Sequence, residues 1–202
     1  QLDMFDKMII PILTYGCKIW GIEDVSILEQ VQIKVCKYIL GLKKSTSNSM
    51  MYGEVGKFPI TVMIKSRLIS YWHCLAQGKE TKLSNILYKC MYNLYCNGEY
   101  ESPWLKCVHN ILIECGLNNV WISQGENVDK DWLKSYVVQI QKDLFVQKWV
   151  SDINSSQKCC LYKHYKTEFK LEKYLVDLPL TLSKPLVKYR TLNSKLPVER
   201  KI

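Results

Sequence analysis

Apolar and polar residues alternate with a helical period along most of this chain. Across residues 25–40 the apolar positions are three or four residues apart, which predicts an amphipathic helix. These positions are Val25, Leu28, Val31, Val35, Ile39 and Leu40. Ser26 and Glu29 resemble a capping box at the start of this helix, and Gly41 suits its C-terminal cap.

The same pattern predicts helices through most of the remaining sequence. Residues 2–20 have helical spacing, and Pro11 predicts a kink or a break there. A short helix should begin at residue 48 or 49 and end near Gly53, which forms a turn with Gly56. Further helices are expected over residues 59–76, 83–96, 103–116 and 129–150.

Strand signals are weak, and Val120–Ser123 is the only short candidate. The sequence therefore predicts an all-α protein, an irregular helical assembly with little or no strand. We expect two packed subdomains, residues 1–77 and residues 82–202, the second ending in a basic tail.

The composition is that of a folded protein rather than a disordered one. The chain has 202 residues, of which 48% are hydrophobic, enough to bury a core. It begins with Gln1 rather than Met, and we expect it to be a piece of something longer. No secretory signal is visible, and the longest apolar stretch, Met8–Gly21, is too interrupted to span a membrane. We expect an intracellular protein, in the nucleus or the cytoplasm.

Nine cysteines are irregularly spaced, which favours reduced and mostly buried thiols over a disulfide framework. Two groups could in principle supply zinc ligands. They are Cys159, Cys160 and His164, and Cys90, Cys96, Cys107 and His109. No C-x-x-C pair is present to begin a structural site, so we expect no metal and no cofactor.

The net charge of +9 is unevenly distributed. Residues 31–72 contain seven basic residues and one acid, and residues 161–202 contain ten basic residues and four acids, whereas residues 81–160 are balanced. Two basic zones of this kind suggest a polyanion partner, although solvated lysine faces that serve only solubility are the competing explanation. The aromatic residues that accompany the second zone have helical spacing, which favours core packing over base stacking.

The stretch LGLKKSTSNSMMYGEVGKFPI, residues 40–60, contains the groups that usually contact phosphate oxygens. They are Lys43, Lys44, Ser45, Thr46, Asn48 and Lys57. It is not a nucleotide-binding P-loop, because it lacks the G-K-[ST] ending. No nucleophile with a neighbouring base and no pair of carboxylates suited to a metal occurs, so we expect no catalytic residues.

Several short motifs along the chain resemble one family. They are Pro11–Gly16, Trp20–Gly21, Cys36–Lys37, Leu40–Gly41, Lys43–Thr46 with Asn48, Tyr52–Glu54 with Gly56 and Pro59, and Arg67 with Tyr71–Trp72. Further on they are Ser102–Trp104, Glu114–Gly116, Gln147–Trp149 with Ser151–Asp152, Lys188–Thr191, Asn193 and Leu196–Glu199. This order is similar to the segment that follows the palm in reverse transcriptases of non-LTR (LINE-type) retrotransposons, over essentially the whole chain.

The resemblance implies a thumb-like subdomain over residues 1–77 and a downstream linker over residues 82–202. The thumb of such enzymes clamps an RNA–DNA hybrid or duplex through its backbone. The implied nucleic-acid contacts are Lys43, Lys44, Ser45, Thr46, Asn48, Lys57, Lys65, Arg67, Lys188 and Arg190. Gly53 and Gly56 would permit close approach of the backbone to phosphate.

The departures from the family concern catalysis. No Tyr/Phe-Ala-Asp-Asp loop is present to bind the catalytic metals, so the chain should not polymerise. Lys18 stands where family members often have an acid after Tyr-Gly-x. The sequence thus predicts a non-catalytic fragment that binds the nucleic-acid backbone. Two alternatives are a helical scaffold without a nucleic-acid ligand and a protein-interaction surface made of apolar faces, which exposed apolar residues around Ile9–Trp20 would favour.

Overall fold

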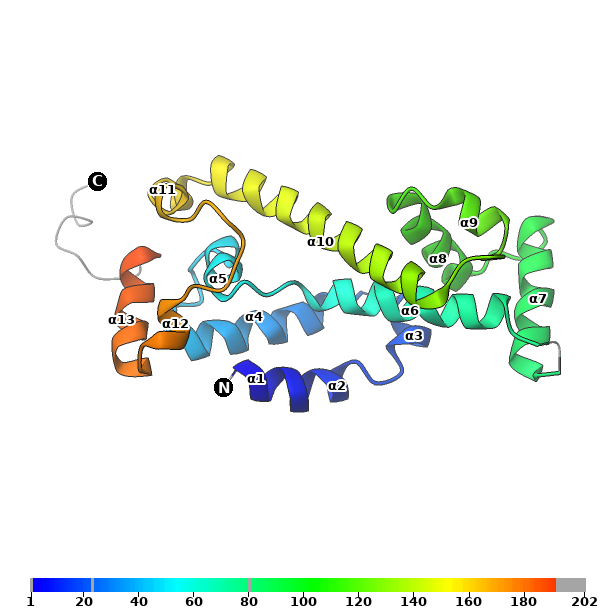
Figure 1. Ribbon diagram of the computed structural model, residues 1–202, viewed down its shortest axis with the longest axis horizontal. Coiled ribbons are helices and arrows are strands. Elements are labelled where there is room, and N and C mark those ends of the chain that lie inside the picture. Colours follow the sequence, from blue (N-terminus) through cyan, green and yellow to red (C-terminus); the bar gives the residue numbers. More distant parts are fainter. Residues whose placement is uncertain (1, 23, 80, 192–202) are drawn as a thin grey trace. The chain divides into compact units, whose positions relative to one another are not determined.

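The computed structural model describes residues 2–22, 24–79 and 81–191 (Figure 1). These residues form helices joined by turns and contain no strand, which confirms the predicted all-α class. The chain divides into two compact units. Unit 1 comprises Gln1–Ile10, Ile27–Pro59 and Leu144–Ile202, and unit 2 comprises Pro11–Ser26 and Ile60–Asp143.

The bounds of the units differ from the predicted division into residues 1–77 and 82–202. Unit 1 is assembled from three segments that are separated in the sequence, because their side chains are buried against one another. For example, the indole Nε1 of Trp149 donates to the carbonyl of Ser49, 100 residues earlier, at 2.8 Å. The long helix α10 (Lys130–Ser155) contributes its beginning to unit 2 and the remainder to unit 1.

Unit 2 is built around α6 (Ile60–Ala76), which packs against three other helices of the unit. They are α3 (Cys17–Trp20), α7 (Leu83–Cys96) and α8 (Pro103–Glu114), the last followed by α9 (Asn118–Ile122). Because α6 is apolar on most of its circumference, it can be covered on several sides. Its Trp72 is fully buried, donates to the Tyr88 hydroxyl at 2.8 Å and stacks on Trp121.

Unit 1 has its own core between α4 (Ser26–Leu40), α5 (Asn48–Val55) and the later part of α10. The other elements are α1 (Leu2–Met4), the π-helical turn η1 (Phe5–Ile9), the start of α2 (Ile10–Leu13), η2 (Gln157–Cys159), α11 (Tyr162–Tyr165), α12 (Tyr174–Asp177) and α13 (Leu180–Arg190). Met50, Met51 and Tyr162 are fully buried there. Burial of side chains of this size contributes about 1.5–3 kcal/mol each to folding.

Helix ends with clear capping signals were predicted well. Gly41 has a left-handed φ of 68° and the Leu42 amide donates to the Lys37 carbonyl at 2.8 Å, which is the bonding expected of a glycine-terminated helix. Ser102 Oγ caps α8 by accepting from the Leu105 amide at 3.3 Å. Helix α7 has the predicted bounds, 83–96.

The weak strand candidate at Val120–Ser123 is helical, since α9 covers most of it. The amides of Trp121 and Ser123 donate to carbonyls four residues earlier, at 3.2 and 2.9 Å. Trp121 is buried while Ile122 is 67% exposed, so a short helix presents its one large aromatic side chain to the core.

Three turns also differ from expectation. The helical segment that contains Pro11 begins with a π-helical turn before the proline and continues to Leu13. A turn at residues 14–16 follows, in which Gly16 has a φ of 67°. Gly53 lies inside α5, which ends at Val55 before Gly56. At the start of α4, Asp24 accepts from the Ser26 amide at 2.8 Å, so Asp24 takes the capping role expected of Ser26.

All nine cysteines are free thiols, as predicted, but they are not mostly buried. Cys17, Cys36, Cys115 and Cys159 are buried, Cys107 is intermediate, and Cys74, Cys90, Cys96 and Cys160 are exposed. Among the residues that the structure describes, no helix has the length and apolarity needed to cross a membrane.

Candidate nucleic-acid interface

The loop between α4 and α5 is held in shape by a lysine from inside unit 1. The Lys37 side chain is buried, and its Nζ donates to the carbonyls of Lys44 and Thr46 at 3.0 and 2.6 Å. These two bonds tie the loop to the last turn of α4. The side chains of Lys43, Lys44 and Ser45 remain exposed.

Helix α13, labelled in Figure 1, contributes two more lysines beside this loop. Lys184 and Lys188 are four residues apart and therefore lie on one side of α13. A Cβ built on Gly41 would lie 3.5 Å from Lys184 Cδ and 3.5 Å from Lys188 Cε, so both aliphatic stems lie against Gly41. Fully buried Val187 anchors this part of α13 in the core of unit 1. We call Lys43, Lys44, Lys184 and Lys188 the basic surface.

The charge of the basic surface is not neutralised within the described chain. Across residues 2–22, 24–79 and 81–191, no ion pair joins any of its four lysines to an acid. Burial, together with the positive charge of Lys158, lowers the pKa of Lys37 beneath the loop. Like charges gathered in this way repel one another, and a polyanion placed among them relieves that repulsion.

A groove of about 600 Å³ adjoins the loop in unit 1. Ile33 and Leu42 give it an apolar floor, and Lys34 and Lys44 stand among its lining residues. Tyr38 also lines it and is 83% exposed. An exposed aromatic ring beside lysines is the combination that stacks a base while the lysines contact phosphate.

The polar residues predicted beside these lysines have varied environments. Ser45 and Asn48 are exposed, and Asn48 is both the first residue of α5 and part of the groove lining. Thr46 is half-buried, with its carbonyl bonded to Lys37. Of the predicted hydroxyl and amide contacts, Ser45 and Asn48 are therefore the most accessible.

Lys57 does not join the basic surface. Its Nζ pairs with the Asp6 carboxylate and lies 5.9 Å from the centre of the Phe5 ring. The Lys57 side chain is only 17% exposed. It joins the first turns of the chain to the rest of unit 1, an environment that differs from the expected contact with phosphate.

Lys65 and Arg67 belong to unit 2 and have partners there. Lys65 Nζ lies 2.7 Å from Glu114 Oε2 and donates to Gln141 Oε1 at 2.9 Å. Arg67 Nη1 donates to the hydroxyl and the carbonyl of Thr14 at 2.7 and 3.2 Å. Lys65 is thus neutralised by a carboxylate, whereas Arg67 keeps its charge among neutral partners.

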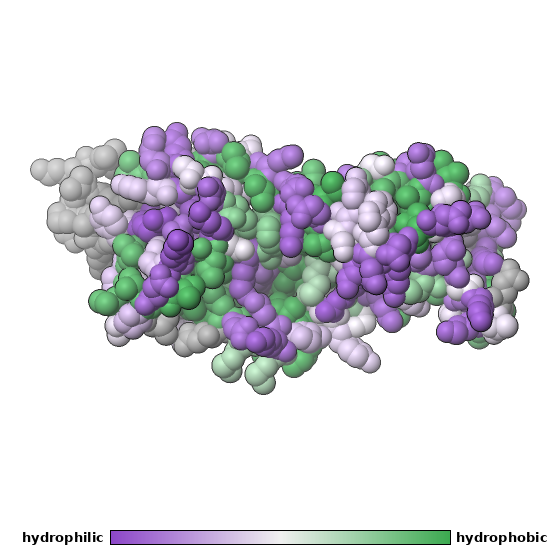
Figure 2. Space-filling view, viewed as in Figure 1, coloured by the Kyte–Doolittle hydropathy of each residue, from purple (hydrophilic) through white to green (hydrophobic). Residues whose placement is uncertain are grey.

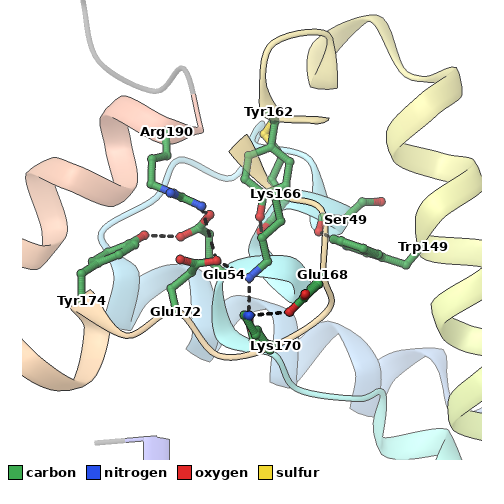
Figure 3. Close-up of polar contacts among 11 residues, drawn as sticks. Ser49, Glu54, Trp149, Tyr162, Lys166, Glu168, Lys170, Glu172, Tyr174 and Arg190 are labelled. Carbon is green, nitrogen blue, oxygen red and sulfur yellow. Dashed lines mark hydrogen bonds and ion pairs between the residues drawn. The ribbon is translucent and has the colours of Figure 1, made fainter. Parts of the chain in front are cut away.

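Arg190 is part of a buried polar network, although it lies only two residues after Lys188 (Figure 3). Its Nε donates to Glu54 Oε1 at 3.1 Å, and its Nη2 lies 3.4 Å from Glu172 Oε1. Glu54 has no exposed surface and also accepts from the Tyr174 hydroxyl. Lys166, itself buried, pairs with Glu172. The guanidinium therefore compensates buried Glu54 and half-buried Glu172, an environment that differs from its predicted role at the interface.

The two glycines expected to admit phosphate are covered by protein instead. A Cβ on Gly53 would lie 2.6 Å from Tyr162 Oη and 2.9 Å from Trp149 Cζ2. A Cβ on Gly56 would lie 2.2 Å from the Leu171 amide nitrogen. The close approach that both glycines permit is made by other segments of unit 1.

Lys184 and Lys37 were absent from the predicted contacts. The sequence signals for Lys184 are its place in the second basic zone, residues 161–202, and its spacing of four residues from Lys188, which places both on one side of a helix. Nothing in the sequence distinguishes buried Lys37 from its neighbours. In the described part of the chain, no three His, Cys, Asp or Glu residues lie close enough together to hold a metal ion.

Comparison with known protein families, with curated proteins and with solved structures finds no match to this chain.

Proposed function

We propose that this chain binds nucleic acid through its phosphate backbone at the basic surface of unit 1, without catalysing a reaction. The observation that supports this is that Lys184 and Lys188 lie against Gly41, at the start of the loop in which Lys43 and Lys44 are exposed, with no acid paired to any of the four among the described residues. Four cations on one surface favour a polyanion, and contacts to phosphate alone are tolerant of sequence.

The motifs that resemble non-LTR retrotransposon reverse transcriptases indicate the kind of nucleic acid. We propose that the chain corresponds to the thumb and downstream linker of such an enzyme, and that its ligand is an RNA–DNA hybrid or another duplex. The Tyr38 groove beside the loop would add stacking for an unpaired base at the edge of the duplex.

The test is fluorescence anisotropy of a labelled RNA–DNA hybrid titrated with the whole chain over a series of salt concentrations. Binding should weaken steeply with salt, with a log–log slope of about −0.9 per phosphate contact. A Lys43→Ala/Lys44→Ala variant should therefore bind more weakly and have a slope shallower by about 1.8.

The matched control is Lys79→Ala/Lys82→Ala, which removes the same charge from two exposed lysines of unit 2. It should leave the slope unchanged, because these lysines are not part of the basic surface. An equally reduced salt slope in both double variants would show that binding depends only on the net charge of the chain and not on the basic surface. Absence of binding at low salt by a folded chain would leave the proposal without support.

A protein-interaction surface is the second candidate. Hydrophobic side chains are exposed between hydrophilic ones on the face drawn in Figure 2. Within unit 2, Ile12 is 73% exposed, Tyr15 86% and Ile19 59%. Exposed apolar residues this close in sequence favour a protein partner. This candidate predicts no binding in the anisotropy experiment, which separates it from the first.

A further inference from the structure

A pocket of about 430 Å³ in unit 2 has a lining rich in cations. It lies among the turn at Thr14–Gly16, helix α6 and the first turns of α10. Four of its lining residues are basic, Lys18, Arg67, Lys130 and Lys134, and one is acidic, Asp131. We call it the α6 pocket. It shares no residue with the basic surface of unit 1.

Arg67 is held in place at the pocket rather than left to move in solvent. Thr14 is almost fully buried and accepts two bonds from the same guanidinium nitrogen, Nη1. Within the described residues, Nη2 and Nε of Arg67 make no hydrogen bond. A guanidinium fixed on one side presents its remaining donors in a defined direction, and this geometry suits phosphate oxygens.

Ser70 supplies a second and independent sign of a ligand. Its hydroxyl oxygen is buried, lines the same pocket and has no hydrogen-bond partner among the residues described. Ser70 is three residues after Arg67 and hence on the same side of α6. Buried hydroxyls are nearly always bonded, and an anion between Ser70 and Arg67 would accept from both.

The lysines complete the positive environment. Lys18 Nζ lies 4.7 Å from the centre of the Tyr71 ring, which holds it beside the pocket. Lys130 and Lys134 are one turn apart on α10, and both line the pocket. Asp131 offsets only one of these four charges. The pocket volume falls in the range of about 300–1,000 Å³ that small-molecule sites occupy, larger than a lone phosphate needs.

From these features we infer that the α6 pocket binds a phosphate monoester, with Arg67 and Ser70 bonding the phosphate and the lysines compensating its charge. A dianionic phosphate satisfies a lining of four cations better than a carboxylate does. The ester could belong to a free small molecule or to the phosphorylated end of a nucleic-acid strand, since both present the same group.

The first experiment is calorimetric titration of the whole chain with inorganic pyrophosphate, a probe for the phosphate group. One site should be observed, and Lys134→Ala should weaken it by about tenfold, roughly the loss of one charge-assisted hydrogen bond. Lys43→Ala/Lys44→Ala is the matched control and should bind pyrophosphate as the unaltered chain does. This control also separates failure of the pocket from failure of the basic surface.

The Ser70→Ala variant distinguishes a ligand contact of Ser70 from a purely structural role, because the two roles predict different changes in stability and in binding. Removing an unpartnered buried hydroxyl should leave thermal stability the same or higher, yet pyrophosphate binding should weaken. A folded chain that does not bind pyrophosphate would overturn the inference. So would Ser70→Ala and Lys134→Ala variants that both bind pyrophosphate as tightly as the unaltered chain does.

Competition then identifies the source of the phosphate. Displacement of pyrophosphate by a 5′-phosphorylated oligonucleotide, but not by its 5′-hydroxyl counterpart, supports a strand end. Displacement by neither supports a free small-molecule ester. Equal displacement by both would mean that the pocket binds phosphodiesters, which contradicts a monoester site.

Discussion

Gly53 provides helix α5 with a position without a side chain, and two aromatic rings pack against the helix backbone there. Trp149 and Tyr162 bond to the carbonyls of Ser49 and Met50, one turn earlier on α5, and both rings are buried. A Cβ would meet them at 2.9 and 2.6 Å, so one of the rings or the helix must move. The requirement for glycine here comes from packing, since the residue lies in the middle of a helix.

Gly53→Ala should therefore lower the free energy of unfolding by about 1–3 kcal/mol, the usual cost of overpacking. Helix propensity acts in the opposite direction, because Ala is favoured over Gly by about 1 kcal/mol within a helix. Urea unfolding followed by circular dichroism measures the difference. Gly116→Ala is a useful comparison, since its surroundings are open and only its left-handed φ of 71° opposes the change. A Gly53→Ala variant more stable than the unaltered chain would contradict this account of the packing.

At the scale of one element, the two sides of α13 have different environments. Lys188 lies against Gly41 at the basic surface, while Arg190 compensates the buried carboxylate of Glu54 and lies beside half-buried Glu172. A helix turns by about 100° per residue, so a separation of two positions places their side chains on nearly opposite sides. The same helix thus has a residue of the proposed binding surface and a stabilising ion pair at positions that are almost adjacent in sequence.

Arg190→Met and Lys188→Ala should consequently have separate effects. Arg190→Met leaves fully buried Glu54 without its cation and should destabilise the chain by about 3–5 kcal/mol. Lys188→Ala should change stability by less than about 0.5 kcal/mol but reduce the salt slope of nucleic-acid binding by about 1. Urea unfolding and anisotropy on both variants test this. Adding Glu54→Gln to Arg190→Met should recover part of the lost stability, and no recovery would argue against a charge effect.

At the scale of the whole molecule, both units bury groups that ionise in alkali. Burial raises the pKa of Cys36 in unit 1 from 9.0 to about 11. Burial and the neighbouring Cys96 thiol raise the pKa of Tyr92 in unit 2 to about 12. Burial also raises the pKa of Tyr52, Tyr162 and Tyr174, in each case reinforced by a nearby glutamate. The folded chain therefore holds these protons more tightly than the unfolded chain does.

Stability should fall as the pH rises above about 9, where the unfolded thiol begins to lose its proton. The folded pKa is the higher one, so the stabilisation is complete below the unfolded pKa and is lost by about pH 11 for Cys36. A difference of two pKa units corresponds to about 3 kcal/mol. Urea midpoints measured across this range test the decline, and Cys36→Ala should make it less steep. A midpoint that stays constant to pH 11 would contradict the burial of these groups.

The division of the chain into two units is also a property of the whole molecule. A boundary between residues 77 and 82 is expected if segments that are neighbours in the sequence are assumed to pack together. However, the core of unit 1 includes Leu40, Met51, Trp149 and Val187. These residues pack together because each belongs to a helix whose apolar face must be covered by another element. Several apolar faces of the chain are able to cover each of them. Periodicity identifies the faces and leaves their pairing to the tertiary structure.

The sequence by itself determined the all-α class and most helix bounds. Helices α6, α7 and α8 are where their Pro59, Gly98 and Ser102–Pro103 signals place them, because capping depends on residues within one turn. The sequence also places Lys43 and Lys44 in a loop between two well-defined helices, and the structure has both side chains exposed there.

Only the tertiary structure decided which cations remain available for a ligand. Lys57, Lys65 and Arg190 pair with acids that are 51, 49 and 136 residues away in the chain. Lys184, in contrast, reaches Gly41 from the far end of the sequence and joins the basic surface. A lysine or arginine keeps its charge for a partner only if no carboxylate is folded against it. The position of the carboxylates depends on which helices pack together, and this pairing cannot be derived from the local sequence.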